Sequence, residues 1–156
     1  MAVLRADLEV TERHNHSFTV AYTPLGEDAT VSWGGPDFRF KNNTKYPVKI
    51  VASQSGSSCN MKIIGTKTSD KTVSLSTDIL STLNYETVEK TDATLAPGSR
   101  ETSQSGTTGY KTVTYKTITE NGKSTTVKAN NSYYKKRDKI VLVGPAAVSY
   151  THIRAH

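Results

Sequence analysis

Residues 106–144 read GTTGYKTVTYKTITENGKSTTVKANNSYYKKRDKIVLVG and decide the fold class of this 156-residue chain. Thr, Val, Ile and Tyr alternate there with Lys and other polar residues, a period of two that is typical of β-strands. Asn121-Gly122 lies between two such runs and strongly indicates a tight hairpin turn. An apolar run, residues 139–143, closes the stretch. We therefore predict long polar strands with little core.

The composition of the whole chain also indicates a mainly β protein. Hydrophobic residues make up 35% of it, which supports one or two small domains and excludes a large enzyme. Residues 79–156 carry 11 Lys and Arg against 6 Asp and Glu, whereas residues 1–78 carry 9 against 8. This basic excess suits nucleic acid or the anionic polymers of a bacterial wall, or simply keeps a strand face soluble. The basic run of residues 135–139 is too short to indicate nucleic-acid binding.

The N-terminal half predicts a helix end followed by a small antiparallel sheet. Apolar residues in AVLRADLEV, residues 2–10, have near-helical spacing without an N-cap, so we interpret them as the end of a helix. Period-two runs separated by Gly, Pro and Asn turns then predict short strands. These runs are SFTVAY (17–22), ATVSW (29–33), DFRFKN (37–42), YPVKIVAS (46–53), CNMKIIGTK (59–67) and TVSLS (72–76). We place a domain boundary near residue 80.

The last residues, VSYTHIRAH (148–156), fit neither pattern. They closely resemble a translated transposon adapter from sequencing libraries, so we expect residues 147–156 to be a non-native tail and the chain to be a fragment. Cys59 is the only cysteine, which excludes an intramolecular disulfide, and the four histidines show no metal-ligand spacing. We predict no metal and no cofactor. No apolar run approaches the roughly 18 residues that span a bilayer.

Three motifs within residues 8–50 occur in a fixed order: ER-x-x-HS, P-x-G-x-DATV and DFRFKNNT-x-YP. Together they resemble the VanW family of bacterial envelope proteins, named from vancomycin-resistance clusters, over about residues 1–66. The resemblance implies a partial α+β VanW domain, residues 1–79. In that family a glycine-rich turn and a Cys-Gln-x-Ser motif precede this block, whereas the present sequence starts inside the helix.

Residues 85–146 resemble the domain named for its five glycines, the G5 domain of Gram-positive surface proteins. The matching glycines are Gly98, Gly106, Gly109, Gly122 and Gly144. The resemblance implies an elongated thin β-sheet module, residues 80–146, that binds peptidoglycan or another N-acetylglucosamine polymer, or serves as a stalk. It also implies an extracellular or wall-associated location, with membrane attachment only through a missing anchor.

His16 and Asp37 are the candidate catalytic residues. A cysteine nucleophile needs a base and a group that orients the base. The VanW order of Cys at a helix N-terminus, then His, then Asp is similar to that of transglutaminase-like and papain-like enzymes. His16 would be the base and Asp37 the orienting group, with the Cys upstream of residue 1. Alternatively, both are turn residues. Cys59, in a predicted strand, is not expected to replace the nucleophile.

Aromatic side chains supply candidate ligand contacts. Trp33 and Phe38 form either a sugar platform or ordinary core, and Arg13 either pairs with Glu9 or Glu12 or binds a carboxylate substrate. Aromatic rings beside Lys residues suit glycan contact, although a thin sheet also needs rings for packing. The tyrosines in question are Tyr110, Tyr115, Tyr133 and Tyr134.

We predict a fragment of a bacterial envelope protein that binds cell-wall glycan or acts as a stalk, with no nucleic-acid partner. As written, the chain lacks the candidate nucleophile and is not expected to be catalytic. Two alternatives remain open. One is a truncated cysteine amidase, peptidase or transpeptidase, and the other is a vancomycin-resistance accessory factor without chemistry.

Overall fold

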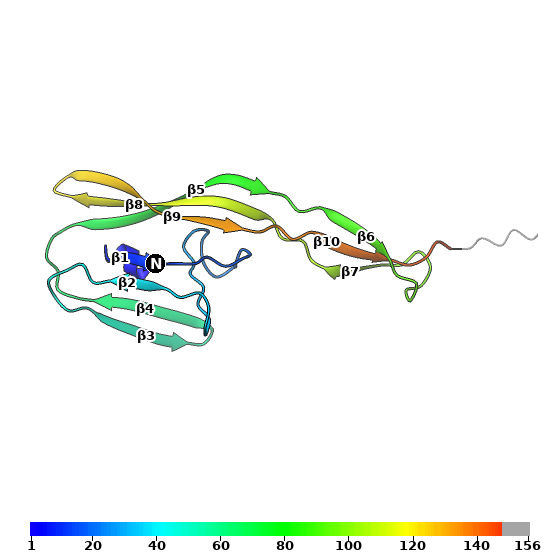
Figure 1. The fold of residues 1–156 in the computed structure, drawn as a ribbon, viewed down its shortest axis with the longest axis horizontal. Coiled ribbons are helices and arrows are strands. Elements are labelled where there is room, and N and C mark those ends of the chain that lie inside the picture. The colour runs from blue at the N-terminus through cyan, green and yellow to red at the C-terminus, as the bar shows by residue number, and fades with distance from the viewer. Residues whose placement is uncertain (148–156) are drawn as a thin grey trace, which may run out of the picture.

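The computed structural model describes residues 1–147 and confirms a mainly β fold. Figure 1 shows an elongated body, with the N-terminal segment beside one end of a long sheet and the last strands at the other end. The described elements are α1 (Ala2–Arg5), β1 (Glu9–Glu12), β2 (Arg39–Lys41), β3 (Lys49–Ser55), β4 (Ser58–Ile64), β5 (Thr72–Leu83), β6 (Thr87–Thr91), β7 (Arg100–Gln104), β8 (Gly109–Glu120), β9 (Lys123–Tyr134) and β10 (Lys139–Val143).

The N-terminal segment holds two small antiparallel pairs, β1 with β2 and β3 with β4. The predicted helix over residues 2–10 is too long, because α1 ends at Arg5 and residues 9–12 form β1. Asp7 ends the helix with φ 57°, a left-handed conformation that Asp tolerates better than most residues. Its carboxylate accepts hydrogen bonds from Lys71 Nζ at 2.7 Å and Lys116 Nζ at 2.6 Å. These ion pairs hold Asp7 where the helix ends, although the apolar residues continue at helical spacing as far as residue 10.

Two of the predicted strands are wrong: residues 17–22 and 29–33 are irregular. Both stretches alternate as strands do, but neither lies along a strand edge that would complete a ladder. Single backbone hydrogen bonds hold this part of the chain instead. Thr30 N donates to His14 O at 2.8 Å, and Lys135 N donates to Ser17 O at 2.7 Å. The first bond joins two parts of the loop of residues 13–38, and the second joins the loop to the residue that follows β9.

The long sheet has the order β5–β8–β9 and is antiparallel throughout. The predicted hairpin is confirmed: β8 and β9 are joined at Asn121 and Gly122, whose φ angles are 50° and 73°. Two positive φ angles are what a tight hairpin turn with the sheet's own twist requires. β5 runs unbroken across residue 80, so the boundary placed there lies inside a strand.

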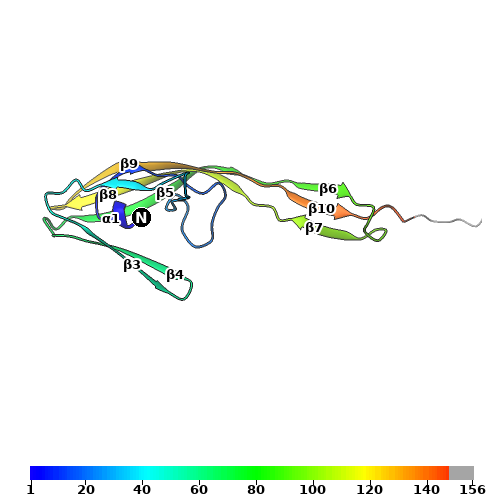
Figure 2. The same cartoon turned by 60° about the horizontal axis from the view of Figure 1, so that its bottom comes forward.

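The far sheet has the order β6–β10–β7, with β10 parallel to β6 and antiparallel to β7. The two three-stranded sheets follow one another along the long axis and have little thickness (Figures 1 and 2), which confirms the elongated thin module. Gly109 at the start of β8 faces backbone, since a Cβ there would lie 2.5 Å from Tyr134 O and 2.6 Å from Lys136 N. Only glycine fits this close approach.

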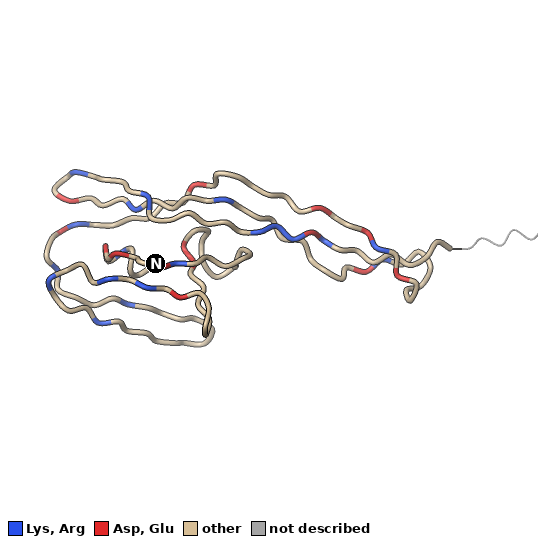
Figure 3. Tube along the Cα trace, viewed as in Figure 1, with Lys and Arg blue, Asp and Glu red and all other residues tan. Residues whose placement is uncertain are grey.

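The small core lies where α1 and the loop of residues 13–28 pack on the β5–β8–β9 sheet. Its buried members come from both parts of the chain: Val3, Leu4, Leu8, Asp28, Thr112, Thr114, Ser132 and Tyr134, whereas Val113 is buried on the opposite face of the sheet. Figure 3 shows Lys and Arg scattered along the remaining strands with acidic residues between them. Among residues 1–147, no helix has the length and apolar character needed to cross a bilayer.

Candidate functional site

His16 lies at the junction between the N-terminal segment and the long sheet, and its carboxylate partner is Asp28. His16 Nδ1 lies 2.8 Å from Asp28 Oδ2, and the His16 backbone N–H donates to the same oxygen at 2.7 Å. On the other side of the ring, Nε2 lies 3.1 Å from the Tyr22 hydroxyl. The imidazole is held in one orientation, with Nε2 on its more exposed side.

Asp28 is almost completely buried, with 1% of its side chain exposed. Arg13 Nη2 lies 3.2 Å from Asp28 Oδ1, and the Tyr134 hydroxyl donates to the same oxygen. Burial alone would raise the pKa of Asp28, but the hydrogen bonds from Tyr134 and His16 and the charge of Arg13 outweigh it and lower the pKa. Burial and the Asp28 carboxylate raise the pKa of Tyr134. The cluster therefore holds an ionised carboxylate and a neutral phenol.

The P-x-G-x-D motif explains how Asp28 reaches this position. Glu27 N donates to Pro24 O at 3.1 Å, which closes a turn, and Gly26 has φ 77°. A Cβ on Gly26 would lie 2.1 Å from Thr114 Oγ1, so glycine lets the turn pack directly on β8. Gly26 N also donates to the Tyr134 hydroxyl at 2.7 Å. The turn thus positions Asp28 against the sheet, within hydrogen-bonding distance of Tyr134.

Arg13 joins the segment to β9 rather than pairing with Glu9 or Glu12, as one reading of the sequence had it. Its Nη1 donates to Ser132 Oγ at 2.7 Å and to Asn130 Oδ1 at 3.2 Å, while Nε donates to Asp28 O at 2.8 Å. Only 7% of its side chain is exposed. A buried guanidinium with partners on both sides acts as a cross-link between the two parts.

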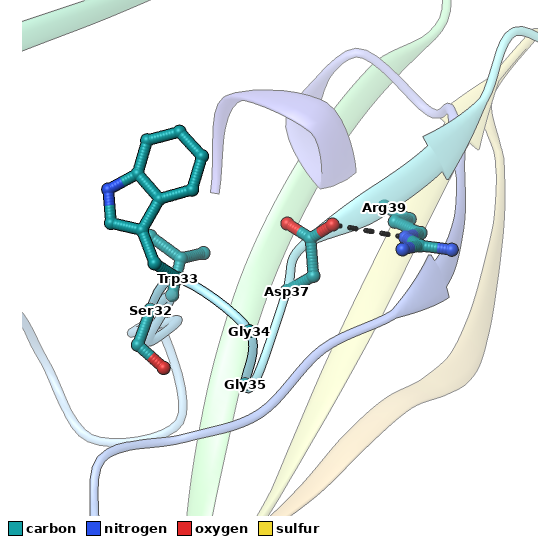
Figure 4. Close-up of a pocket in the computed structure, with 7 residues that line it drawn as sticks. Ser32, Trp33, Gly34, Gly35, Asp37 and Arg39 are labelled. Atoms are coloured by element: carbon teal, nitrogen blue, oxygen red, sulfur yellow. Dashed lines mark hydrogen bonds and ion pairs between the residues drawn. The ribbon is translucent and has the colours of Figure 1, made fainter.

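Asp37 lies apart from this cluster, on the loop before β2 (Figure 4). Its carboxylate accepts hydrogen bonds from Phe38 N at 2.8 Å and Arg39 Nε at 3.1 Å, which lower its pKa. Among residues 1–147, no hydrogen bond joins Asp37 to His16. The structure brings His16 together with Asp28, which lies nine positions before Asp37. The His16–Asp37 pairing expected from chain order is not formed.

Trp33 is fully exposed (105%), which overturns the reading of it as core. Phe38 is partly buried and lies 6.5 Å from Phe40, ring centroid to centroid, so it packs within the segment. Cys59 is also exposed, on β4, and does not have the buried position expected of an isolated cysteine. Residues 1–147 contain no group of three or more His, Cys, Asp or Glu side chains arranged to hold a metal ion.

The four tyrosines divide between the two faces of the long sheet. Tyr110 pairs with Tyr134 across β8 and β9 on the face that carries Thr114 and packs on the Gly26 turn. Tyr134 is 1% exposed and therefore cannot serve as the surface sugar contact expected from the sequence. Strand alternation puts Tyr115 and Tyr133 on the opposite face. Tyr133 is 50% exposed there.

Reasoning from the sequence missed Asp28 and the role of Tyr134. The P-x-G-x-DATV block is one of the motifs of the VanW resemblance, but nothing within it marks Asp28 as the partner of His16. Asp28 and Tyr134 are 106 residues apart, and no local pattern reports a contact over that separation. The signal that pointed to His16 was the order of motifs, which does not identify the carboxylate.

Comparisons with known proteins find matches to two protein families. The family model "VanW like protein" matches residues 1–64, and the family model "G5 domain" matches residues 77–146. The uncharacterized protein YoaR of Bacillus subtilis (strain 168) is 53% identical over 57 residues, which cover 36% of this chain. The match spans about a fifth (19%) of the length of YoaR.

Two solved G5 structures are also similar. The G5 domain of an IgA1 protease is 15% identical with a TM-score of 0.35 and covers 51% of this chain and 98% of its own. The crystal structure of HP0197-G5 is 22% identical with a TM-score of 0.27 and covers 49% and 100%, respectively. By the family models, the chain is similar to VanW-like proteins over residues 1–64, the VanW-like segment, and to G5 domains over residues 77–146, the G5 domain of this chain.

Proposed function

We propose that this chain is part of a bacterial cell-envelope protein whose G5 domain binds cell-wall glycan, either peptidoglycan or another N-acetylglucosamine polymer. The VanW-like segment and the G5 domain both support an extracellular or wall-associated location. One face of a sheet in the G5 domain would contact the glycan.

The observation that carries the proposal is the face of the β5–β8–β9 sheet that carries Tyr115 and Tyr133. The VanW-like segment contacts the opposite face, which carries Thr114 and Lys116. Lys111 lies opposite Tyr133, with Nζ 5.8 Å from the ring centroid, and Lys128 lies opposite Tyr115. Aromatic rings contact the C–H faces of sugars, while the ammonium groups suit the carboxylates and phosphates of wall polymers.

Co-sedimentation with purified peptidoglycan sacculi tests this proposal. We expect the double variant Tyr115→Ala/Tyr133→Ala to bind about tenfold more weakly, the effect of losing aromatic contacts from a binding face. Tyr46→Ala, which removes an exposed tyrosine from the VanW-like segment, is the matched control and should bind like the wild type. If the double variant also binds like the wild type while retaining its β-sheet circular dichroism, the glycan role of this face is lost and the module is a stalk.

The His16–Asp28 pair favours a second candidate function. A histidine whose Nδ1 faces a buried carboxylate presents Nε2 as a base, the arrangement found beside activated nucleophiles. The parent protein would then be a cysteine amidase, peptidase or transpeptidase acting on wall peptides. His16 would be the base and Asp28, in place of Asp37, the orienting group, with a thiol supplied from outside the described residues.

A full-length protein that contains this segment is needed to test the second candidate. We expect His16→Ala to abolish turnover of muropeptides, whereas His14→Ala, whose exposed ring contacts only Glu12, should leave turnover unchanged. Asp37→Asn should retain the maximal rate at saturating muropeptide if Asp28, and not Asp37, orients the ring. Equal activity of the His16→Ala and His14→Ala proteins would contradict a catalytic role for His16.

A further inference from the structure

Trp33 stands at the tip of a well-defined loop within the VanW-like segment. It is the only tryptophan in the chain, and its indole is fully exposed. A tryptophan can bury 150–250 Å² of largely apolar surface, so leaving it in water forgoes a substantial stabilisation. An indole held outward in this way needs an explanation beyond packing of the described chain.

The loop backbone fixes Trp33 in that position. Gly35 N donates to Ser32 O at 3.2 Å, closing a four-residue turn with Trp33 and Gly34 at its corner. Gly34 has φ 69°, as the third residue of a type II turn requires. Ser32 N donates to Pro36 O at 2.9 Å, which ties the base of the loop together. Trp33 is thus presented by a closed loop.

Asp37 completes the site from the far side of the same loop. Figure 4 shows the Trp33 indole and the Asp37 carboxylate projecting from the loop toward the same side, with Arg39 bonded to the carboxylate. The space around them is an open surface hollow of about 550 Å³, whose lining residues are mostly exposed to solvent. Its remaining lining residues are Val31, Ser32, Gly34 and Gly35.

We propose that this loop is a second carbohydrate site, which stacks one pyranose ring of a wall glycan on Trp33. The C–H face of the sugar contacts the indole by dispersion, and a sugar hydroxyl or acetamido N–H donates to the Asp37 carboxylate. Arg39 and the Phe38 amide hold that carboxylate in place and keep it ionised. The choice of a wall glycan rests on the proposed envelope function, whereas the site itself is separate from the tyrosine face of the G5 domain.

Tryptophan fluorescence tests the site directly, because Trp33 is the only indole in the chain. Soluble N-acetylglucosamine oligomers should change its emission saturably in the wild type and equally in Tyr115→Ala/Tyr133→Ala. Asp37→Asn should weaken this response about tenfold, the effect of losing one hydrogen bond to a charged acceptor. Asp70→Asn, which alters an exposed carboxylate outside the loop, is the control and should respond like the wild type.

Three results would overturn the proposal. The first is an unchanged emission at oligomer concentrations where calorimetry shows that the chain binds sugar. The second is a blue shift that depends on protein concentration alone, which would assign the loop to a contact between copies. The third is an indole already shielded from iodide in the full-length protein, which would show that another segment covers it. A failure of sacculus binding by the tyrosine face would leave this fluorescence result unaffected, so the two proposals fail separately.

Discussion

At the scale of single residues, Asp28 holds two distant stretches of the chain together. Its carboxylate receives hydrogen bonds from His16 and Arg13 in the VanW-like segment and from Tyr134 at the end of β9. A buried carboxylate is costly to desolvate, and a set of donors this complete is what offsets the cost. Removing the carboxylate leaves the buried Arg13 guanidinium and the buried Tyr134 hydroxyl without this shared acceptor.

We therefore expect Asp28→Asn to lower the free energy of unfolding by about 3 kcal/mol, because it leaves the buried Arg13 guanidinium without its counter-charge. Urea denaturation followed by circular dichroism measures the change. Asp70→Asn, at a site where 94% of the side chain is exposed, should leave the midpoint nearly unmoved. A similar midpoint for both variants would show that the Asp28 cluster contributes little to stability.

Acid should destabilise the protein through the same carboxylate. The pKa of Asp28 is lower in the folded chain than its ordinary value of 3.8, so the folded state binds the proton less tightly than the unfolded state. Its contribution is complete above that ordinary value and is lost as the pH falls through the lower folded value. Thermal melting between pH 7 and pH 2 should show this loss. Asp28→Asn should have a shallower acid dependence, and parallel curves would count against the assignment.

Thr112 offers a stabilising substitution. Its hydroxyl is buried without a hydrogen-bond partner among the described residues. Thr112→Val keeps the branched shape on β8 and removes the unsatisfied group, so the free energy of unfolding should rise by about 1 kcal/mol. Thermal melting against Thr125→Val, an exposed position on β9, separates this effect from strand propensity. A larger gain at Thr125 than at Thr112 would contradict the explanation.

At the scale of elements, strands are predicted well where their pattern and their turns agree. The β8–β9 hairpin follows from alternation and from Asn121-Gly122, both of which are local. The irregular path of residues 17–22 does not follow from alternation, because the pattern predicts a strand without supplying a partner. His16 was found from motif order, whereas Asp28 and Tyr134 meet only through the tertiary fold. The sequence therefore predicted the sheets and half of the candidate site.

Gly109 gives an element-scale prediction. Gly109→Ala would place a Cβ within 2.5–2.8 Å of three backbone atoms of residues 134–136 and should force β8 away from the end of β9. We expect a loss of about 2 kcal/mol, typical of overpacking against atoms that cannot move aside. Amide hydrogen exchange should show the loss of protection concentrated at this end of the hairpin. A uniform loss along β8 would point to a different cause.

At the scale of the whole molecule, the VanW-like segment and the G5 domain share one core. α1 packs against β5 of the long sheet, the Gly26 turn rests on β8, and Arg13 and Asn15 donate to β9. The segment contributes only two short strand pairs of its own, too little to bury a core alone. The two parts resemble different families, yet their side chains pack together as one structural unit.

We accordingly expect a chain of residues 1–71 to remain unfolded, because Asp28, Arg13 and Ser17 would each lose a partner that lies in β9 or just after it. Its amide proton spectrum should be narrow, and proteolysis should be rapid, whereas residues 1–147 should show a dispersed spectrum. A dispersed spectrum for residues 1–71 would demonstrate an independent domain and would contradict the shared core.

The arrangement of β10 sets the order in which the molecule is completed during synthesis. β10 is the last described strand, yet it forms the centre of its sheet, between β6 and β7. A chain that leaves the ribosome or a translocation channel N-terminus first presents β6 and β7 while the strand that joins them is still inside. The tip of the G5 domain therefore closes only when residues 139–143 emerge, and until then its two outer strands offer open edges to other chains in transit.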